Sequence, residues 1–258
     1  MLPESVNTII INTGNIISSK DFKKKATQSP SEEVCDSVSG AFQMWLKSIY
    51  TSYNFDSDVV FCDNNPDMKV EKSDRAELKI SVKVFLETYS CEILRSVISQ
   101  AMETLGIQMI DSLILSLPAL SNDEIFDLNN IKPLWIELEN LVAEGKIVTI
   151  GISDLDTKEL TTLYEWTQVK PSVNQVNLES CCVMPTEMIA FAKENDIQLL
   201  THNDPKVLLP NEMFKKILEP GVKNPDEWKR AWIVRYSVVV KFRGIIQNKG
   251  YLLSATKR

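Results

Sequence analysis

The sequence predicts an α/β fold in which a parallel sheet closes into a (β/α)8 barrel, the TIM-barrel architecture. Short apolar segments alternate with amphipathic helical segments about eight times along the 258 residues, and such alternation indicates a parallel sheet covered by helices. No GxGxxG motif follows the first apolar segment, and the chain has only 8 glycines, which disfavours an open, doubly wound dinucleotide-binding sheet. Because no linker interrupts the alternation, a single domain over residues 1–258 is expected.

The first part of the chain supplies three strands and two helices by pattern. Residues 6–11 form a short apolar segment that is rich in β-branched side chains, which favours a buried strand. Apolar residues recur at three- and four-residue steps over 31–50, as on one face of a helix. A weak strand is predicted at 58–61, and alternation of apolar and polar side chains predicts another at 78–86. Helical spacing returns over 93–105 and ends at a glycine.

The middle of the chain continues the alternation. Residues 112–117 are apolar and end at a proline, which predicts a strand. A helix over 131–144 stops at a glycine, and a strand over 147–150 ends at the next glycine. Two leucines and a tryptophan share one face of a predicted helix over 156–167, and a strand follows at 173–176.

The last part begins in the same way, with a helix predicted over 186–195 and a strand over 197–200. Helical spacing predicts two further helices, over 211–219 and 226–236. The apolar run 237–246 is expected to be the closing strand of the barrel.

Segments near residues 15–30 and 51–77 give no clear element apart from the weak strand. The second is polar and rich in turn residues, as in Asn64-Asn65-Pro66-Asp67. Both are predicted to be mobile parts of the single domain.

Charge and composition disfavour several function classes. The net charge is −7 and the pI is near 5.0, whereas a nucleic-acid backbone binder needs an electropositive face. Five cysteines without a CxxC pair predict neither a metal site nor a disulfide framework. The N-terminus does not resemble a secretory leader, and no apolar run approaches membrane-spanning length. We therefore expect a cytoplasmic protein without metal, nucleic-acid or membrane partners.

Residues 134–153 carry a specific resemblance. They contain Leu134-Trp135-Ile136-Glu137-Leu138, then Glu144-Gly145-Lys146, then Ile150-Gly151-Ile152-Ser153. This run closely resembles the corresponding segment of aldo-keto reductases. The resemblance implies a barrel of the aldo-keto reductase type, in which the active site lies at the carboxyl ends of the strands.

Further segments are similar to one branch of that superfamily, the modifier (regulatory) subunits of glutamate–cysteine ligase. They include Asn174-Gln175-Val176, Cys181-Cys182-Val183-Met184-Pro185, Asp196-Ile197-Gln198-Leu199-Leu200 and Arg235-Tyr236-Ser237-Val238. The similarity extends from about Asn7 to about Leu253. It implies a non-catalytic regulatory subunit in glutathione biosynthesis that forms a heterodimer with the ligase catalytic subunit. It further implies that this subunit modulates the glutamate affinity and the glutathione feedback inhibition of its partner.

The same resemblance identifies catalytic groups that the chain lacks. Reductases of this superfamily use a tyrosine acid assisted by a lysine, an aspartate and a histidine. Lys83 fits the lysine position, Ser116 stands where the histidine is expected, and residues 51–77 hold no convincing Asp-x-x-x-x-Tyr pair. Because general acid catalysis contributes about 10²–10⁴-fold, negligible turnover is expected. Lys83 is either a relic of the catalytic lysine or a barrel-mouth lysine paired with a carboxylate.

Some of the positions that contact the cofactor in reductases are matched in this chain, and others are not. Ser153 and Gln175 match residues that contact the nicotinamide amide in reductases, but Asp154 stands where those enzymes have asparagine. His202 replaces their stacking tyrosine, and is either a pH- or ligand-sensing group or a satisfied structural residue. The chain departs from their C-terminal phosphate-binding tail, so the cofactor-clamping segment is expected to be missing and no cofactor to be bound.

The adjacent residues Cys181 and Cys182 leave several interpretations open. They either bridge to a partner chain, sense thiol oxidation, or act as small buried apolar residues. Two functions compete with the regulatory one. The first is an NADPH-dependent aldo-keto reductase acting on small carbonyl compounds, and the second is a barrel that senses a metabolite without turnover.

Overall fold

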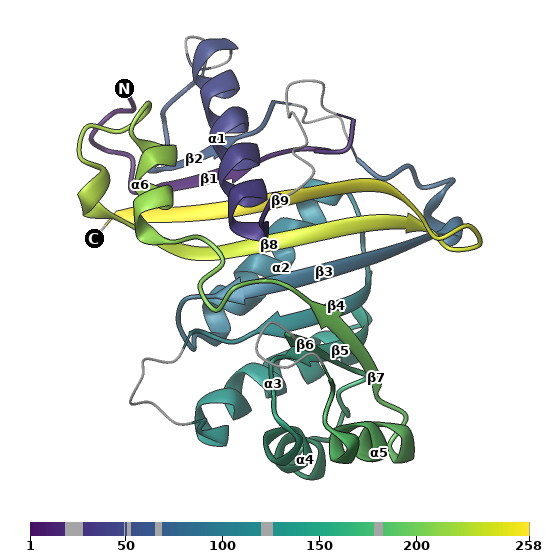
Figure 1. The fold of residues 1–258 in the computed structure, drawn as a ribbon. Helices are drawn as coiled ribbons and strands as arrows, with labels where there is room; N and C mark the ends of the chain where they lie inside the picture. Colours follow the sequence, from purple (N-terminus) through teal and green to yellow (C-terminus); the bar gives the residue numbers. More distant parts are fainter. Residues whose placement is uncertain are drawn as a thin grey trace. The chain divides into compact units, whose positions relative to one another are not determined.

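The computed structural model describes residues 1–18, 28–48, 50, 53–64, 69–119, 126–177 and 183–257. The chain divides into two units (Figure 1). Unit 1 comprises Met1–Leu78 together with Pro205–Arg258, and unit 2 comprises Lys79–Asp204.

Unit 2 is built on a five-stranded parallel sheet with helices between successive strands. The strands are β3 (Leu78–Leu86), β4 (Ile110–Ser116), β5 (Ile147–Ser153), β6 (Val173–Asn177) and β7 (Gln198–His202). They pair side by side in chain order. The helices are α2 (Cys91–Leu105), α3 (Leu128–Ala143), α4 (Thr157–Trp166) and α5 (Thr186–Glu194). Since the strands are parallel, their carboxyl ends meet at one edge of the sheet, where functional groups collect in such folds.

Local sequence signals set the helix boundaries of unit 2. The Ser90 side chain caps α2 by accepting a hydrogen bond from the Ile93 N–H at 3.2 Å. The same helix ends at Gly106, whose φ of 65° lies in the left-handed region that favours glycine. Asp156 and Glu159 form a capping box at the start of α4.

The core of unit 2 explains why residues 134–153 have their characteristic pattern. Trp135 of α3 is fully buried, and its indole N–H donates to the Val169 carbonyl at 3.0 Å. Ile150 and Ile152 of β5 are 0% exposed. The run therefore encodes a helix, a turn and a strand that pack together.

Unit 1 is built on a four-stranded mixed sheet. Strand β1 (Thr8–Asn12) pairs parallel with β2 (Val59–Cys62) and antiparallel with β9 (Ile245–Lys257). Strand β9 pairs antiparallel with β8 (Trp228–Val240). The helices are α1 (Pro30–Ser48) and α6 (Asn211–Leu218), with 3-10 turns η2 (Arg75–Glu77) and η3 (Pro225–Glu227). Figure 1 shows α1 lying on one face of this sheet, where it buries Val34, Val38, Phe42 and Trp45.

The predicted α/β class with parallel strands covered by helices is confirmed in unit 2, where all predicted strands and helices are found. Two predictions for the C-terminal part are wrong. Residues 226–236 form η3 and β8 rather than a helix, and residues 237–246 form the end of β8, a turn and the start of β9 rather than one closing strand. An antiparallel hairpin thus replaces the last predicted βα repeats, because the two 13-residue strands satisfy each other's backbone groups.

The single domain over residues 1–258 and the mobility of the segments near 15–30 and 51–77 stay predictions. Residues 19–27, 51–52 and 65–68 lie outside the described residues. In the described ranges, no helix has the length and apolar character needed to cross a bilayer.

Candidate functional site

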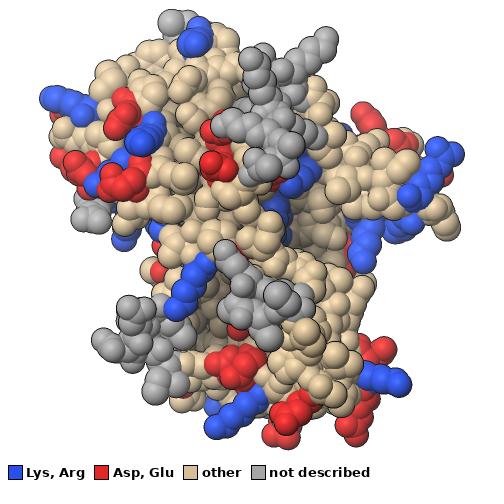
Figure 2. All heavy atoms as spheres, in the orientation of Figure 1, with Lys and Arg blue, Asp and Glu red and all other residues tan. Residues whose placement is uncertain are grey.

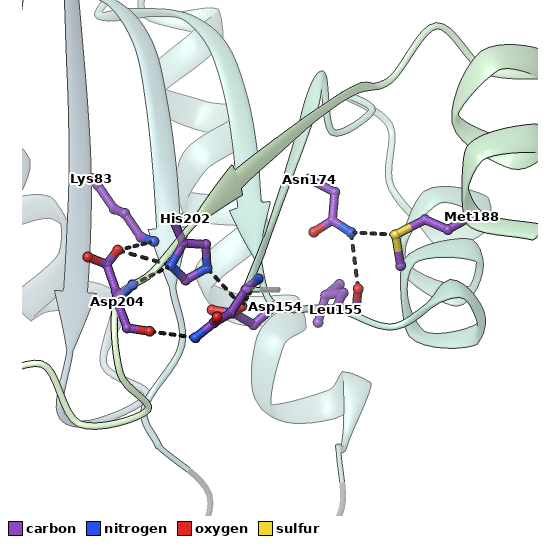
Figure 3. Close-up of polar contacts among 8 residues, drawn as sticks. Lys83, Asp154, Leu155, Asn174, Met188, His202 and Asp204 are labelled. Carbon is purple, nitrogen blue, oxygen red and sulfur yellow. Dashed lines mark hydrogen bonds and ion pairs between the residues drawn. The ribbon is translucent and has the colours of Figure 1, made fainter. Parts of the chain in front are cut away.

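A cluster of charged and amide side chains lies at the carboxyl ends of the strands of unit 2 (Figure 3). Lys83 projects from β3, and Asp154 directly follows β5. Asn177 ends β6, His202 ends β7, and Asp204 follows two residues later. The parallel topology therefore joins groups that are as many as 121 positions apart in the sequence.

A buried ion pair holds Lys83. Its Nζ lies 2.9 Å from Oδ2 of Asp204, and the two side chains are only 5% and 3% exposed. A buried charge is costly unless it is paired and hydrogen-bonded, so each of these groups requires the other. Lys83 thus has the surroundings of a mouth lysine paired with a carboxylate, one of the two alternatives that the sequence left open.

His202 lies between two carboxylates, as Figure 3 shows. The Asp204 backbone N–H donates to its Nδ1 at 3.1 Å, and its Nε2 lies 2.9 Å from Oδ1 of Asp154. A neutral His202 consequently carries its proton on Nε2 and donates it to Asp154. A doubly protonated ring would direct Nδ1–H toward Oδ2 of Asp204, which is 3.2 Å away.

These contacts shift two pKa values in opposite directions. Burial by itself lowers the pKa of His202, but the hydrogen bonds to Asp154 and Asp204 outweigh it and raise that pKa above its ordinary value. Burial by itself raises the pKa of Asp154, but the hydrogen bond and the charge of His202 outweigh it and lower that pKa. The imidazolium form of His202 is therefore stabilised at this site.

Asn177 closes the network. Its backbone N–H donates to Oδ1 of Asp154 at 3.1 Å, and its side-chain amide donates to the Asp204 carbonyl at 2.7 Å. Asp154 has a φ of 65°, a left-handed conformation that aspartate tolerates better than most residues. The fully buried Asn174 holds the next turn by donating to the Leu155 carbonyl at 3.0 Å. The ring of contacts therefore links β3, β5, β6 and β7.

The other predicted site residues are placed differently. Ser153 and Gln175 are neighbours in the register of β5 and β6. Ser153 Oγ and Gln175 Oε1 are buried and have no hydrogen-bond partner within the described residues. Ser116 ends β4, where its partner in the register of β3 is Phe85. Cys181 and Cys182 lie outside the described residues.

Sequence reasoning missed the carboxylates of this site. Asp154 was expected only as a replacement for asparagine, and Asp204 was not among the expected site residues. The available signal was a carboxylate within two residues of a strand end. In unit 1, Asp63 follows β2 and accepts a hydrogen bond from Asn12 Nδ2 at 3.0 Å. An Asp-x-x-x-x-Tyr pair starting there would require a tyrosine at position 68, where the sequence has Met68.

The residues present do not fit a bound nicotinamide dinucleotide, the cofactor implied by the resemblance. The unpartnered atoms of Ser153 and Gln175 could still hydrogen-bond a carboxamide. The cations of the same cluster, Lys83 and His202, already pair with the carboxylates of Asp204 and Asp154 and are therefore less available to a phosphate group. Residues 246–251, which stand where reductases have their phosphate-binding tail, lie within strand β9 (Ile245–Lys257), whose backbone pairs with β1 and β8.

The similarity of this chain to known proteins includes unit 2 and extends over most of unit 1. The aldo/keto reductase family matches residues 61–204. The human glutamate–cysteine ligase regulatory subunit is 43% identical over 258 residues, which cover 97% of this chain and 93% of that protein. A putative glutamate–cysteine ligase regulatory subunit of Schizosaccharomyces pombe is 28% identical over 70% of this chain and 72% of its own length. Glyoxal reductase of Bacillus subtilis is also 28% identical, over 67% of this chain and 62% of its own length.

Proposed function

Because the chain belongs to the aldo/keto reductase family and, within it, to the glutamate–cysteine ligase regulatory subunits, we propose that it is a non-catalytic regulatory subunit of that ligase. It forms a heterodimer with the ligase catalytic subunit in the cytoplasm and acts in glutathione biosynthesis. It changes its partner's affinity for glutamate and its feedback inhibition by glutathione. Such regulation is a coupling free energy between sites, typically about 1–3 kcal/mol.

The observation that supports a non-catalytic role is the buried ion pair of Lys83. In a reductase, the lysine assists a tyrosine acid by lowering its pKa. Here the ammonium group is 2.9 Å from Asp204 and both side chains are buried, so its charge stabilises a carboxylate instead. The Met68 that stands five residues after Asp63 cannot donate a proton. The pairing of Lys83 with Asp204 therefore supports a scaffold that binds a partner rather than one that reduces a carbonyl group.

Co-expression with a glutamate–cysteine ligase catalytic subunit tests this function. We expect the two chains to co-purify in equal amounts. The KM for glutamate should fall, and the inhibition constant for glutathione should rise, by about fivefold or more, as a coupling of about 1 kcal/mol requires. Separate elution of the chains together with unchanged kinetics would contradict the proposal.

An NADPH-dependent reductase acting on small carbonyl compounds is the second candidate function. One observation favours it, namely the unpartnered buried atoms Ser153 Oγ and Gln175 Oε1, which resemble part of an amide-binding site. Titration with NADPH, followed by tryptophan fluorescence, tests for binding, and NADPH oxidation with a panel of aldehydes tests for turnover. Saturable binding that Gln175→Ala weakens, together with turnover, would favour the reductase. Failure of both would favour the regulatory role.

A further inference from the structure

The C-terminal hairpin has a charge opposite to that of the remaining chain. Residues 228–258 contain 8 Lys or Arg residues and no Asp or Glu. The whole chain has 28 basic and 35 acidic residues, so residues 1–227 carry a formal charge of −15 and the hairpin carries +8. Its basic residues are Lys229, Arg230, Arg235, Lys241, Arg243, Lys249, Lys257 and Arg258.

The far end of this hairpin is exposed without interruption over residues 241–247, here called the hairpin tip. Phe242 is 89% exposed, Ile245 55% and Ile246 47%. Single exposed apolar side chains are normal, but a contiguous group that includes an aromatic ring marks an interaction site. Figure 2 shows both basic and acidic side chains on the side of the molecule where this end of the hairpin lies.

The hairpin tip is held in a defined conformation. The Val240 carbonyl accepts a hydrogen bond from the Gly244 N–H at 2.9 Å, and Gly244 has a φ of 61°. Lys241 is fastened to η2 by two bonds, from its N–H to the Glu77 carbonyl at 2.8 Å and from its Nζ to the Ala76 carbonyl at 2.9 Å. An exposed surface that is already ordered loses little conformational entropy on binding.

Part of the positive charge of the hairpin is neutralised by acidic side chains outside the hairpin tip. Lower on the hairpin, Lys249 pairs with Glu33 at 2.6 Å and Lys257 approaches Glu227 at 3.7 Å. Arg243, by contrast, makes no ion pair with any residue that the structure describes. An arginine beside an exposed phenylalanine is a combination enriched in protein–protein interfaces.

We propose that the hairpin tip is a docking surface for the ligase catalytic subunit, where Phe242 enters an apolar recess rimmed by Asp and Glu side chains. The inference rests on the proposed function and specifies its interface. Charge complementarity supports an acidic rim, since the basic residues Lys241 and Arg243 precede and follow Phe242 in the chain. A nucleic-acid backbone would require a more extended basic face than two exposed cations provide.

Two single variants separate the apolar and the electrostatic contributions. Phe242→Ser removes an anchor that is 89% exposed in the free chain, so the fold should be unchanged. It is expected to weaken binding of the catalytic subunit by about tenfold or more, mainly through faster dissociation. Arg243→Glu reverses a charge at the rim. It should slow association at low salt and lose most of its effect in concentrated salt.

Matched controls lie elsewhere on the chain. Lys229→Glu reverses an exposed charge at the opposite end of β8, and Ile136→Ser removes an apolar side chain of α3 that is 47% exposed. Both should bind within about twofold of the unmodified chain, since residues outside a binding centre contribute little. Association and dissociation rates are measured by biolayer interferometry with the catalytic subunit immobilised, and thermal unfolding verifies the fold of each variant.

The outcomes distinguish the two proposals. If the unmodified chain does not bind the catalytic subunit, the proposed function and the docking surface both fail. If it binds and the hairpin-tip variants bind equally well, the docking surface alone is wrong. Sedimentation of the isolated chain adds an independent check. If Phe242→Ser converts an oligomer of this chain into monomers but leaves the heterodimer intact, the hairpin tip contacts a second copy of this chain. That result would also overturn the proposed docking of the hairpin tip on the catalytic subunit.

Discussion

Removal of the Lys83 ammonium group should destabilise unit 2 more than most single changes. Lys83→Met keeps an unbranched side chain but leaves the Asp204 carboxylate, only 3% exposed, without the cation 2.9 Å away. Breaking a buried ion pair on one side costs about 3–5 kcal/mol, because an uncompensated charge remains buried. Replacing both partners, in Lys83→Met with Asp204→Leu, removes that charge and should recover a large part of the loss.

The loss of unfolding free energy in Lys83→Met should depend on pH, because His202 can take up a proton beside Asp204. Its Nδ1 is 3.2 Å from Oδ2 of Asp204, so a protonated ring can replace part of the missing positive charge. The charge of Lys83 normally opposes this protonation, and its removal should raise the pKa of His202 further. We therefore expect Lys83→Met to lose about 3 kcal/mol near pH 6 and up to about 5 kcal/mol near pH 8.5.

Urea unfolding followed by circular dichroism measures these losses, with the m-value compared between variants to verify that the same surface unfolds. Lys146→Met is the matched control, because it removes an ion pair of 2.8 Å whose partners, Lys146 and Glu144, are 39% and 38% exposed. Its transition midpoint should not change. A loss below about 1 kcal/mol for Lys83→Met, or a double variant less stable than the single one, would refute this reasoning.

Three further changes test other parts of unit 2. The folded state raises the pKa of His202 above its ordinary 6.5, so the stability contributed by its contacts is full below pH 6.5 and is lost as the pH rises through the folded-state pKa. His202→Gln should therefore make the thermal-unfolding temperature depend less on pH between about pH 6 and 8. An unchanged dependence on pH would contradict the expected loss of stability at high pH. Asp156→Ala removes the capping box of α4 and should cost about 0.5–2 kcal/mol in urea unfolding, whereas Asp156→Asn should keep most of the cap. Gly151→Ala would place a Cβ 2.7 Å from the Cβ of Val173 and should cost about 1–3 kcal/mol by the same measurement; equal stability would show that β5 and β6 can separate without penalty.

The elements of unit 2 could be predicted because their signals are local. Gly106 ends α2 by adopting a left-handed φ, and Asp156 starts α4 with a capping box. Such contacts span only a few residues, so the sequence around them contains the necessary information. The alternating pattern of β3 likewise matches the burial of Ile80, Val82 and Val84, which are at most 1% exposed.

The hairpin of unit 1 could not be predicted in the same way. Trp228, Trp232 and Tyr236 follow one another at four-residue steps and are buried, a spacing that also suits one face of a helix. What decides for a strand is the pairing of β8 with β9 along most of its length. This pairing is a contact between two strands, which the local pattern around β8 does not contain.

Only some members of the candidate site, and not the contacts between them, could be predicted from the sequence. Lys83 and His202 were expected at the mouth, and pairing of the lysine with a carboxylate was one of two alternatives. The identity of that carboxylate depends on contacts between strands that are far apart in the sequence, as the 121 positions between Lys83 and Asp204 show. Nor could the sequence show that the two acidic residues would occupy opposite sides of one imidazole ring.

The pairing of charges within this site is consistent with the proposed non-catalytic role. An active site retains polar groups that wait for a substrate, and this incomplete pairing costs stability. In unit 2, the ammonium of Lys83, the ring of His202 and the carboxylates of Asp154 and Asp204 pair with one another. Groups arranged in this way stabilise the strand ends and are less available to a ligand. A function that depends on the scaffold then has to use its outer surface, and the exposed, ordered tip of the C-terminal hairpin is a part of that surface suited to binding a protein partner.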